Sequence, residues 1–366
     1  MPDLASVRRL LLDWFASSGR DLPWRRDYAP WSVLVSEVML QQTQMDRVVP
    51  FFDRFLARFP TPAALAAASE EEVLKLWEGL GYYARARNLQ AAARAIAHGH
   101  GGRVPDDPAA LRGLPGVGPY TAAAVASIAF GQDAPLVDAN VERVLARVFD
   151  VDESLATSAG KRRIAALAAE LLPPGRARDF NQALMELGAL ACSKAPRCGE
   201  CPLAGLCEAR RLDITAERPV RAPRKAISHL DVCTGVLTHA GRIFVQKRPT
   251  PGVWAGLWEF PGGRIEPGET PAQAVVREFR EETEFAVQVA EPLGLVRHGY
   301  TTYSVSLHCF LLTLANGGNQ PVLHAADTFR WAGARDLAGL AFPAGHRKLL
   351  DRLEAEGRLP RLLAQG

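Results

Sequence analysis

The chain has 366 residues, of which 48% are hydrophobic, and its formal net charge is +3 at pH 7. This length predicts two or three domains, each large enough to bury a core of its own. No apolar run reaches the length of a membrane span, which excludes an integral membrane protein. The small net charge does not by itself indicate nucleic-acid binding. The arginine-rich stretches at 83–87 and 218–225 either face phosphate groups or lie in solvent.

Helical signals dominate residues 1–210. An amphipathic stripe runs from Val7 to Phe15, and Thr61 before a proline is typical of a helix start. Ser69 followed by Glu72 predicts a capping box at the start of another helix. We therefore expect an all-α domain over residues 1–210.

The character of the sequence changes after residue 210. Residues 211–228 are rich in proline and arginine and lack hydrophobic periodicity, as expected of a linker. Residues 229–366 contain strand-like apolar runs interrupted by one helix, which predicts an α+β domain after the helical one. The expected strands span 232–237, 243–246 and 303–312, and the expected helix spans 271–283.

Four of the six cysteines fall in the pattern C-x5-C-x2-C-x5-C. Thiolates this close in sequence can meet at one centre, either a cubane iron–sulfur cluster or a zinc ion, and the spacing alone does not choose between them. A disulfide framework is the other alternative. The chain opens MPDLASVRRLLLDWF, without the long apolar segment of a secretion signal, so nothing directs it to an oxidising compartment. The four residues are Cys192, Cys198, Cys201 and Cys207.

A glycine-rich connection between two short predicted helices lies at residues 111–122, LRGLPGVGPYTA. The turn through Leu114, Gly116 and Gly118 would expose successive backbone N–H groups, and the following helix adds its positive N-terminal end. Such a turn binds a phosphate without reading a base. The plainer alternative is an ordinary connection between helices.

Two carboxylates lie in apolar surroundings. Asp138, in the segment LVDANV, is expected to cap the helix that begins near Val141, and the cap would also aim its ionised carboxylate. Glu37 lies inside the apolar run VLVSEVML, where an unpaired buried carboxylate is costly. Glu37 is therefore either paired with an arginine or protonated through a pKa raised by burial, and in the second case it can act as an acid near neutral pH.

Together these motifs resemble the helix–hairpin–helix superfamily of base-excision DNA glycosylases, and within it the MutY family of adenine DNA glycosylases. The likeness extends over nearly the whole chain. It implies a bilobal all-α glycosylase domain with a [4Fe-4S] cluster in the loop 192–207, although the first cysteine spacer has five residues where the family usually has six. The other segments that carry the resemblance are LPWR (22–25), SEVMLQQTQ (36–44), WEGLGYYARARN (77–88) and FNQALM (180–185).

The resemblance implies a catalytic role for two acids and two supporting residues. An adenine must first be flipped out of the duplex. Glu37 would then protonate its N7, and Asp138 would stabilise the oxocarbenium-like sugar left behind. Tyr120 and Asn140 would support these two acids through hydrogen bonds.

The resemblance also implies which residues contact DNA. Gln41 or Gln42, together with Tyr82, would enter the duplex as a wedge near the lesion. The other residues expected to contact DNA in the helical domain are Arg25, Leu114, Gly116 and Gly118.

Residues 263–285 resemble the signature of Nudix hydrolases, with only the late glycine replaced, by Glu284. Glu278, Glu281 and Glu282 would share one helix face and could hold Mg²⁺ against a diphosphate, as in MutT-type hydrolases of 8-oxo-dGTP. In adenine glycosylases this domain usually recognises 8-oxoguanine. Recognition alone, recognition with Mg²⁺-dependent hydrolysis, and a plain solvated face of glutamates all stay open. The residues expected to contact the lesion are His298, Tyr300 and Thr301.

The implied function is removal of adenine opposite 8-oxoguanine or guanine in double-stranded DNA. Relatives that resemble endonuclease III form a Schiff base through a lysine after the hairpin. Tyr120 stands there in this chain, so strand cleavage should be weak or absent. The alternatives are an enzyme that also hydrolyses 8-oxo-dGTP, an endonuclease III-like glycosylase and lyase, a Nudix hydrolase with a DNA-binding module, and a non-catalytic cluster-bearing DNA sensor. We expect a monomer in the bacterial cytoplasm, associated with the nucleoid, with replication or mismatch-repair factors as partners.

Overall fold

The computed structural model describes residues 2–222, 227–299, 303–316, 318 and 320–364. The chain divides into two compact units, one of residues 1–67 and 88–224 and the other of residues 68–87 and 225–366. Across the described stretches, no helix is long and apolar enough to cross a membrane.

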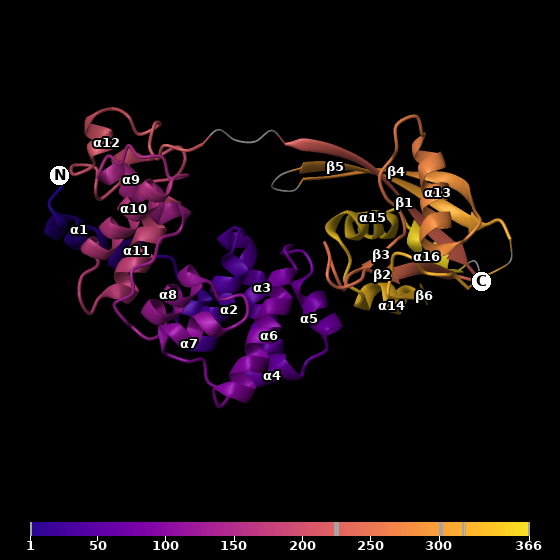
Figure 1. Ribbon diagram of the computed structural model, residues 1–366, viewed down its shortest axis with the longest axis horizontal. Coiled ribbons are helices and arrows are strands. Elements are labelled where there is room, and N and C mark those ends of the chain that lie inside the picture. Colours follow the sequence, from indigo (N-terminus) through magenta and orange to yellow (C-terminus); the bar gives the residue numbers. More distant parts are fainter. Residues whose placement is uncertain (1, 223–226, 300–302, 317, 319, 365–366) are drawn as a thin grey trace. The chain divides into compact units, whose positions relative to one another are not determined.

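The first unit is built from helices that gather in two groups (Figure 1). One group contains α1 and α9–α12, and the other contains α2–α4 and α6–α8. Helix α11 contacts both α9 and α8, and so it joins the two groups. The predicted bilobal all-α domain is confirmed. The helices are α1 (Leu4–Ser18), α2 (Pro30–Leu40), α3 (Met45–Arg58), α4 (Pro62–Ala67), α6 (Ala84–Gly99), α7 (Pro108–Gly113), α8 (Pro119–Ile128), α9 (Ala139–Val148), α10 (Ser158–Leu171), α11 (Ala177–Leu190) and α12 (Glu208–Arg211), with 3-10 turns at Pro23–Arg25 and Cys198–Glu200.

Polar side chains start several of these helices by accepting backbone N–H groups that have no partner within the helix. Asp3 accepts the amide of Ser6 at 2.9 Å at the start of α1. Thr61 accepts the amide of Ala64 at 3.2 Å in the first turn of α4. The predicted helix start at Thr61 and the predicted helix over Val7–Phe15 are therefore confirmed.

The segment 211–222 packs on the first unit, although the sequence predicts a linker over 211–228. The guanidinium of Arg147 on α9 donates to the carbonyls of Thr215 and Arg218 at 2.9 and 3.1 Å. Arg218 in turn forms an ion pair with Asp150 at 2.8 Å. A composition rich in proline and arginine does not distinguish a free linker from a segment bound to a domain. Here hydrogen bonds and an ion pair bind residues 211–222 to the first unit.

Residues 68–87 form one compact unit with the C-terminal part of the chain. They contain α5 (Glu70–Trp77), which Ser69 starts by accepting the amide of Glu72 at 3.2 Å. The hydroxyl of Tyr83 donates to the carbonyl of Phe342 at 3.2 Å. The predicted domain limits of 1–210 and 229–366 differ from the observed units here, because tertiary contacts of one helix and its loop outweigh order along the chain.

The C-terminal part is a sheet with strand order β3-β2-β1-β5-β4, and β6 pairs with β2. Strands β1 and β5 run parallel, from Ser228 opposite Tyr303 to Leu237 opposite Leu312, while the other pairs are antiparallel. The strands are β1 (Ser228–His239), β2 (Arg242–Lys247), β3 (Trp258–Glu259), β4 (Val287–Gly299), β5 (Tyr303–Leu314) and β6 (Thr328–Ala332), and the helices are α13 (Pro271–Thr283), α14 (Ala334–Gly339), α15 (Ala344–Ala355) and α16 (Arg358–Ala364).

Successive side chains of a strand point to opposite faces of this sheet and pack into two separate hydrophobic cores. Phe244 belongs to the cluster that contains Phe279 of α13. Its neighbours Ile243 and Val245 belong to the cluster that contains Leu349 of α15. The predicted α+β domain is confirmed, with the expected helix at Pro271–Thr283. Helices α14–α16 were missed, because charged residues interrupt their apolar positions.

Candidate active site

Glu37 lies on α2, a helix buried along most of its length, and only 5% of this residue is exposed. Burial raises the pKa of Glu37 from 4.5 to about 7. A hydrogen bond with Tyr120 and the charge of Arg25 oppose this rise in pKa, whereas the negative charge of Asp138 contributes to it. A carboxyl group with this pKa carries its proton for much of the time near neutral pH.

Tyr120 and Asp138 reach the same place from two other helices. Tyr120 lies in the first turn of α8, where its hydroxyl donates to Sδ of Met185 at 3.4 Å and also interacts with the carboxyl group of Glu37. Burial and the two nearby carboxylates raise the pKa of Tyr120 well above its ordinary value, so the phenol stays neutral. Asp138 is the N-cap of α9, as predicted. Helices α2, α8 and α9 therefore bring two acids and one phenol together.

The carboxylate of Asp138 is held rigidly. Its Oδ1 accepts the amides of Asn140 and Val141 at 2.9 and 2.7 Å, and its Oδ2 accepts the side-chain amide of Asn140 at 2.8 Å. Burial raises the pKa of Asp138, and these hydrogen bonds oppose that rise. The group is thus fixed in an orientation that favours its charged form despite a partly buried position.

Arg143 connects Asn140 to the cysteine loop. Its Nη2 donates to Oδ1 of Asn140 at 2.8 Å and to the carbonyl of Gly188 at 2.6 Å, and its Nε donates to the carbonyl of Cys192 at 2.6 Å. A Cβ on Gly188 would lie 2.5 Å from Cβ of Asn140, so only glycine lets α11 approach α9 this closely. The position of Asp138 therefore depends on the packing of α9 against α11.

Arg25 is placed differently from the prediction that it contacts DNA. Its guanidinium forms an ion pair with Glu186 at 2.8 Å and donates to Gln182 at 2.7 Å and to the carbonyl of Arg20 at 3.0 Å. Only 10% of the Arg25 side chain is exposed. These internal partners saturate most of its donors, so Arg25 supports the interior near Glu37 rather than reaching a phosphate.

The predicted hairpin lies between α7 and α8. Leu114 is buried, and its carbonyl accepts the amide of Val117 at 3.1 Å, which closes the turn. Gly116 has a φ of +74°, and a Cβ there would lie 2.6 Å from Cβ of Asn88. Gly118 is the N-cap of α8, so the start of this helix faces the turn. This geometry is the one in which a phosphate meets backbone amides and a helix N-terminus.

The three predicted wedge residues belong to different units. Gln41 and Gln42 directly follow α2 in the first unit, where the side-chain amide of Gln41 donates to the hydroxyl of Thr121 at 3.3 Å and Gln42 has a φ of +57°. Tyr82 belongs to the second unit and is 45% exposed with a φ of +48°. Positive φ values are costly for non-glycine residues and often mark functional turns.

All four cysteines of the predicted loop line one cavity beside α9 and α11. Arg147 holds the loop from α9, donating to the carbonyl of Ser193 at 2.7 Å and approaching Sγ of Cys192 at 3.4 Å. Sγ of Cys207 donates to the carbonyl of Arg147 at 3.4 Å. All six cysteines are free thiols, so the disulfide alternative is wrong.

The arrangement of the thiols bears on the choice between zinc and a cluster. A tetrahedral zinc ion with 2.3 Å bonds would hold its four sulfurs about 3.8 Å apart. Among the described Cys, His, Asp and Glu side chains, no three are gathered closely enough to hold one metal ion. Four sulfurs spread around one largely apolar cavity fit a larger group, such as an iron–sulfur cluster, better than a single ion.

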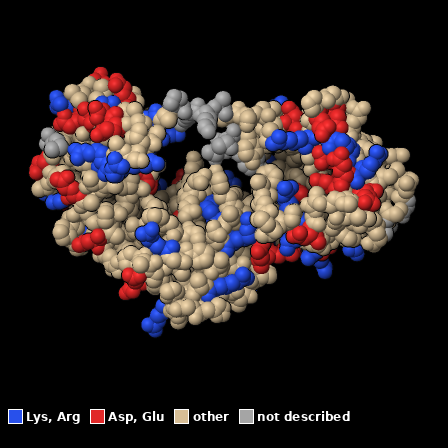
Figure 2. Space-filling view, viewed as in Figure 1, with Lys and Arg blue, Asp and Glu red and all other residues tan. Residues whose placement is uncertain are grey.

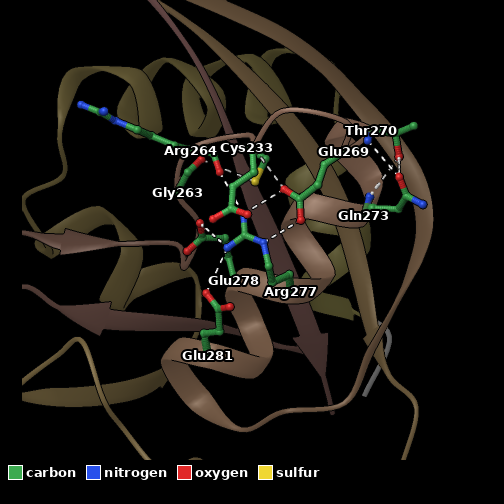
Figure 3. A network of polar contacts seen from close by, with 10 residues as sticks. Cys233, Gly263, Arg264, Glu269, Thr270, Gln273, Arg277, Glu278 and Glu281 are labelled. Carbon is green, nitrogen blue, oxygen red and sulfur yellow. Dashed lines mark hydrogen bonds and ion pairs between the residues drawn. The ribbon is translucent and has the colours of Figure 1, made fainter.

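Three glutamates, one before α13 and two on it, surround Arg277 of that helix (Figure 3). Its guanidinium pairs with Glu269 at 2.7 Å and with both Glu278 and Glu281 at 3.0 Å. On the face shown in Figure 2, acidic side chains gather over α13 with basic side chains among them. Arginine therefore already neutralises two of the three carboxylates predicted to bind Mg²⁺.

The third carboxylate, Glu282, turns to other partners. Its Oε2 accepts the side-chain amide of Gln246 at 2.8 Å and the backbone amide of Gly262 at 3.3 Å. Burial, followed by the charge of Glu259, raises the pKa of Glu282 to about 7. The three glutamates share one helix but not one set of contacts, so as arranged they do not fit a shared Mg²⁺ ion.

The loop predicted to touch the lesion is only partly described. His298 lies on β4, opposite Val305 of β5. Tyr300 and Thr301 lie outside the described residues. Glu284, which replaces the usual glycine of the Nudix signature, keeps a left-handed conformation with φ of +57° and pairs with His324 at 2.8 Å.

Sequence reasoning missed Arg143, Arg147 and Glu186. Their side chains hold Asn140, the cysteine loop and Arg25, respectively. Arg143 and Arg147 are four residues apart on α9, and both are buried. Buried arginines at this spacing share one helix face, and their position in an amphipathic helix was the available signal. Glu186 gave no such signal, because its partners Arg20 and Arg25 are far away in the chain.

Comparisons with known proteins find similarity over both parts of the chain. The family model described as HhH-GPD superfamily base excision DNA repair protein matches residues 35–174, and the NUDIX domain model matches residues 232–352. The adenine DNA glycosylase of Rattus norvegicus is 34% identical over 411 aligned positions, covering 97% of this chain and 79% of the relative.

Solved structures resemble the helical part. A thermostable thymine-DNA glycosylase has a TM-score of 0.52 and 31% identity, covering 57% of this chain and 97% of that protein. Endonuclease III in a non-covalent complex with DNA has a TM-score of 0.50 and 27% identity, covering 58% of this chain and 99% of that protein.

The raised pKa of Glu37 predicts how stability changes with pH. The folded state holds this proton more tightly than the unfolded chain, so the free energy of unfolding falls as pH rises from 4.5 to about 7. A rise from 4.5 to about 7 corresponds to roughly 3 kcal/mol. Glu37→Gln has no carboxyl group to ionise, so its free energy of unfolding should not fall in this way. Measured by chemical denaturation, the stability of the variant relative to the wild type should therefore increase as pH rises from 4.5 to about 7.

The matched control is Glu153→Gln, which changes an exposed carboxyl group of the same unit. It should leave the stability difference constant with pH. A Glu37→Gln difference that is equally constant from pH 4.5 to 8 would contradict the placement of Glu37.

Proposed function

The chain belongs to the adenine DNA glycosylase family, and we propose that it removes adenine opposite 8-oxoguanine or guanine in double-stranded DNA without cutting the strand. As a member of this family it is a base-excision repair enzyme that hydrolyses N-glycosyl bonds. The single observation that carries the proposed mechanism is the buried Glu37, with a pKa of about 7, beside Tyr120 and Asp138.

Glu37 supplies the proton for the departing base. Adenine leaves poorly as an anion, so protonation at N7 lets the electron pair of the C1′–N9 bond go to a neutral leaving base. General acids of this kind contribute about 10²–10⁴-fold to a rate. The hydrogen bond with Tyr120 fixes the direction of the carboxyl group, and burial keeps its proton available near neutral pH.

Asp138 stabilises the sugar that remains. Loss of adenine leaves positive charge on C1′ and the ring oxygen, and a fixed carboxylate lowers the energy of that state. Two backbone amides and Asn140 hold Asp138 ready, so little reorganisation is needed during the reaction. Water then adds to C1′ and completes the hydrolysis.

Binding of the duplex is divided among several groups. We propose that the hairpin at Gly116 and Gly118 holds a phosphate through backbone amides and the start of α8. Gln42 and Tyr82, two residues with positive φ, enter the duplex and favour extrusion of the adenine. The second unit recognises 8-oxoguanine through the segment that begins at His298.

The cysteine loop holds a [4Fe-4S] cluster through Cys192, Cys198, Cys201 and Cys207. When bound, the cluster would cross-link four points of the loop through iron–thiolate bonds. Two arginines of α9, Arg143 and Arg147, orient the loop by donating to its backbone carbonyls. Iron and acid-labile sulfide analysis of the purified protein should give both elements, with loss in Cys198→Ser, and zinc in their place would contradict the assignment.

Strand cleavage is not expected. A lyase needs an amine that forms a Schiff base with the sugar, and the first residues of α8 are Pro119, Tyr120 and Thr121. None of these side chains carries an amine. We therefore propose a monofunctional glycosylase rather than an endonuclease III-like glycosylase and lyase.

Single-turnover release of adenine from A:8-oxoG, A:G and A:C duplexes tests this function. The wild type should release adenine from the first two, and strands should break only after alkali. Glu37→Gln and Asp138→Asn should each lose at least about 10²-fold in rate. The control Glu142→Gln changes another acid on α9 and should retain most of the rate.

The same assay separates the alternatives. Undiminished release by Glu37→Gln would overturn the acid mechanism. A duplex bound without any release of base would favour the non-catalytic sensor. Efficient borohydride trapping of the wild type on DNA would show that the enzyme is a lyase as well.

The second candidate function is Mg²⁺-dependent hydrolysis of 8-oxo-dGTP by the second unit, favoured by three glutamates retained in the Nudix signature. The contacts of Arg277 and Glu282 disfavour it. We expect no pyrophosphate release from 8-oxo-dGTP with Mg²⁺, measured beside an active MutT-type hydrolase. Release that disappears in Glu281→Gln would establish a second activity.

A further inference from the structure

The loop between α5 and α6 displays Tyr82 in a strained conformation. Gly79, Gly81 and Tyr82 all have positive φ, at +106°, +73° and +48°. Tyr82 is the exposed member of this loop, whereas Trp77 before it and Tyr83 after it are buried. A non-glycine residue keeps such a conformation only when its surroundings determine it.

Glu78 ties the start of this loop to the C-terminal part of the second unit. Its Oε1 accepts the backbone amide of Phe342 and Nε of Arg347, both at 2.8 Å. Its Oε2 accepts Nζ of Lys75 at 2.7 Å. The Glu78 side chain is only 11% exposed, so these charge-assisted hydrogen bonds are largely shielded from water.

Tyr83 ties the end of the loop to the same peptide. Its hydroxyl donates to the carbonyl of Phe342 at 3.2 Å. The N–H of Phe342 is therefore bound by Glu78, before Tyr82 in the sequence. Its C=O is bound by Tyr83, directly after Tyr82. Arg87, in the first turn of α6, donates to the carbonyl of Ala255 and adds a further attachment.

Contacts inside the loop complete its shape. Nη2 of Arg85 donates to the carbonyls of Leu80 and Gly81 at 3.2 and 3.0 Å, and Nε1 of Trp77 donates to Gly81 at 3.1 Å. The guanidinium of Arg85 lies 5.5 Å from the centre of the Tyr82 ring. The internal contacts set the turn, and the contacts of Glu78 and Tyr83 set where the turn is anchored.

We propose that Glu78 is a positioning residue, which anchors the loop on the Phe342 peptide so that Tyr82 is presented ready to enter the duplex. This inference rests on the proposed function, in which Tyr82 is part of the wedge. A wedge fixed in advance need not lose conformational freedom when DNA binds, so more of the binding energy is available for extruding the base. The anchor makes the C-terminal part contribute to base extrusion as well as to lesion recognition.

A double-mutant cycle between Glu78 and Tyr82 tests this proposal. The readouts are single-turnover adenine release from an A:8-oxoG duplex and the fluorescence rise of 2-aminopurine placed at the target position. Glu78→Ala should lower both, with a loss of about tenfold in rate, as for a lost hydrogen bond to a charged group. Glu78→Gln keeps an acceptor for the Phe342 amide and should recover part of the rate.

The decisive comparison is made in the Tyr82→Ala background. There Glu78→Ala should cause no further loss, because it acts through Tyr82. Equal losses in both backgrounds, or no loss in either, would overturn the proposal. The control Glu71→Ala removes an exposed ion pair from α5 to Arg330 at 3.4 Å and should change neither readout.

Other outcomes separate this inference from the proposed function. If Tyr82→Ala extrudes the base as well as the wild type, Tyr82 is no wedge and the positioning role fails with it, while adenine release by the wild type still supports the enzyme activity. Should Glu78→Ala fail to fold in thermal melts, Tyr83→Phe removes the hydroxyl that donates to the Phe342 carbonyl. It should lower both readouts in the same direction, and unchanged readouts would count against the anchor.

Discussion

The site depends on one costly arrangement, a carboxylic acid buried beside a second carboxylate. Glu37 sits in the interior of α2, where burial and the charge of Asp138 both favour its protonated form. An apolar side chain such as leucine would be more stable at this position, because a buried acid destabilises the fold whenever it ionises. The phenol of Tyr120 offsets part of this cost and at the same time orients the acid.

The surrounding helices are arranged to hold that pair. Helix α9 begins at Asp138 and carries Arg143 and Arg147, which bind the backbone of the cysteine loop. Gly188 lets α11 lie directly against Asn140. Asp138 and the four-cysteine loop are thus held by the same scaffold of α9 and α11, so a change at either is expected to affect the other.

Sequence reasoning predicted the cap at Asp138 and the burial of Glu37 because local signals carry both. Asp138 could be predicted as a helix cap, and Glu37 was conspicuous in an apolar run. The apolar runs at 232–237 and 243–246 predicted strands, which are observed as β1 and β2. What escaped prediction depends on distant partners: Arg25 turns inward because Glu186 lies there, and residues 68–87 join the C-terminal part through Glu78 and Tyr83.

The most direct measurement of the central claim is the titration of the Glu37 carboxyl group itself. Carbon-13 NMR of the side-chain carboxyl, assigned by its absence in Glu37→Gln, should give a midpoint near pH 7. Replacing Asp138 by asparagine should lower that midpoint, because a neighbouring negative charge is removed. A midpoint near 4.5 in the wild type, unchanged by Asp138→Asn, would contradict the account.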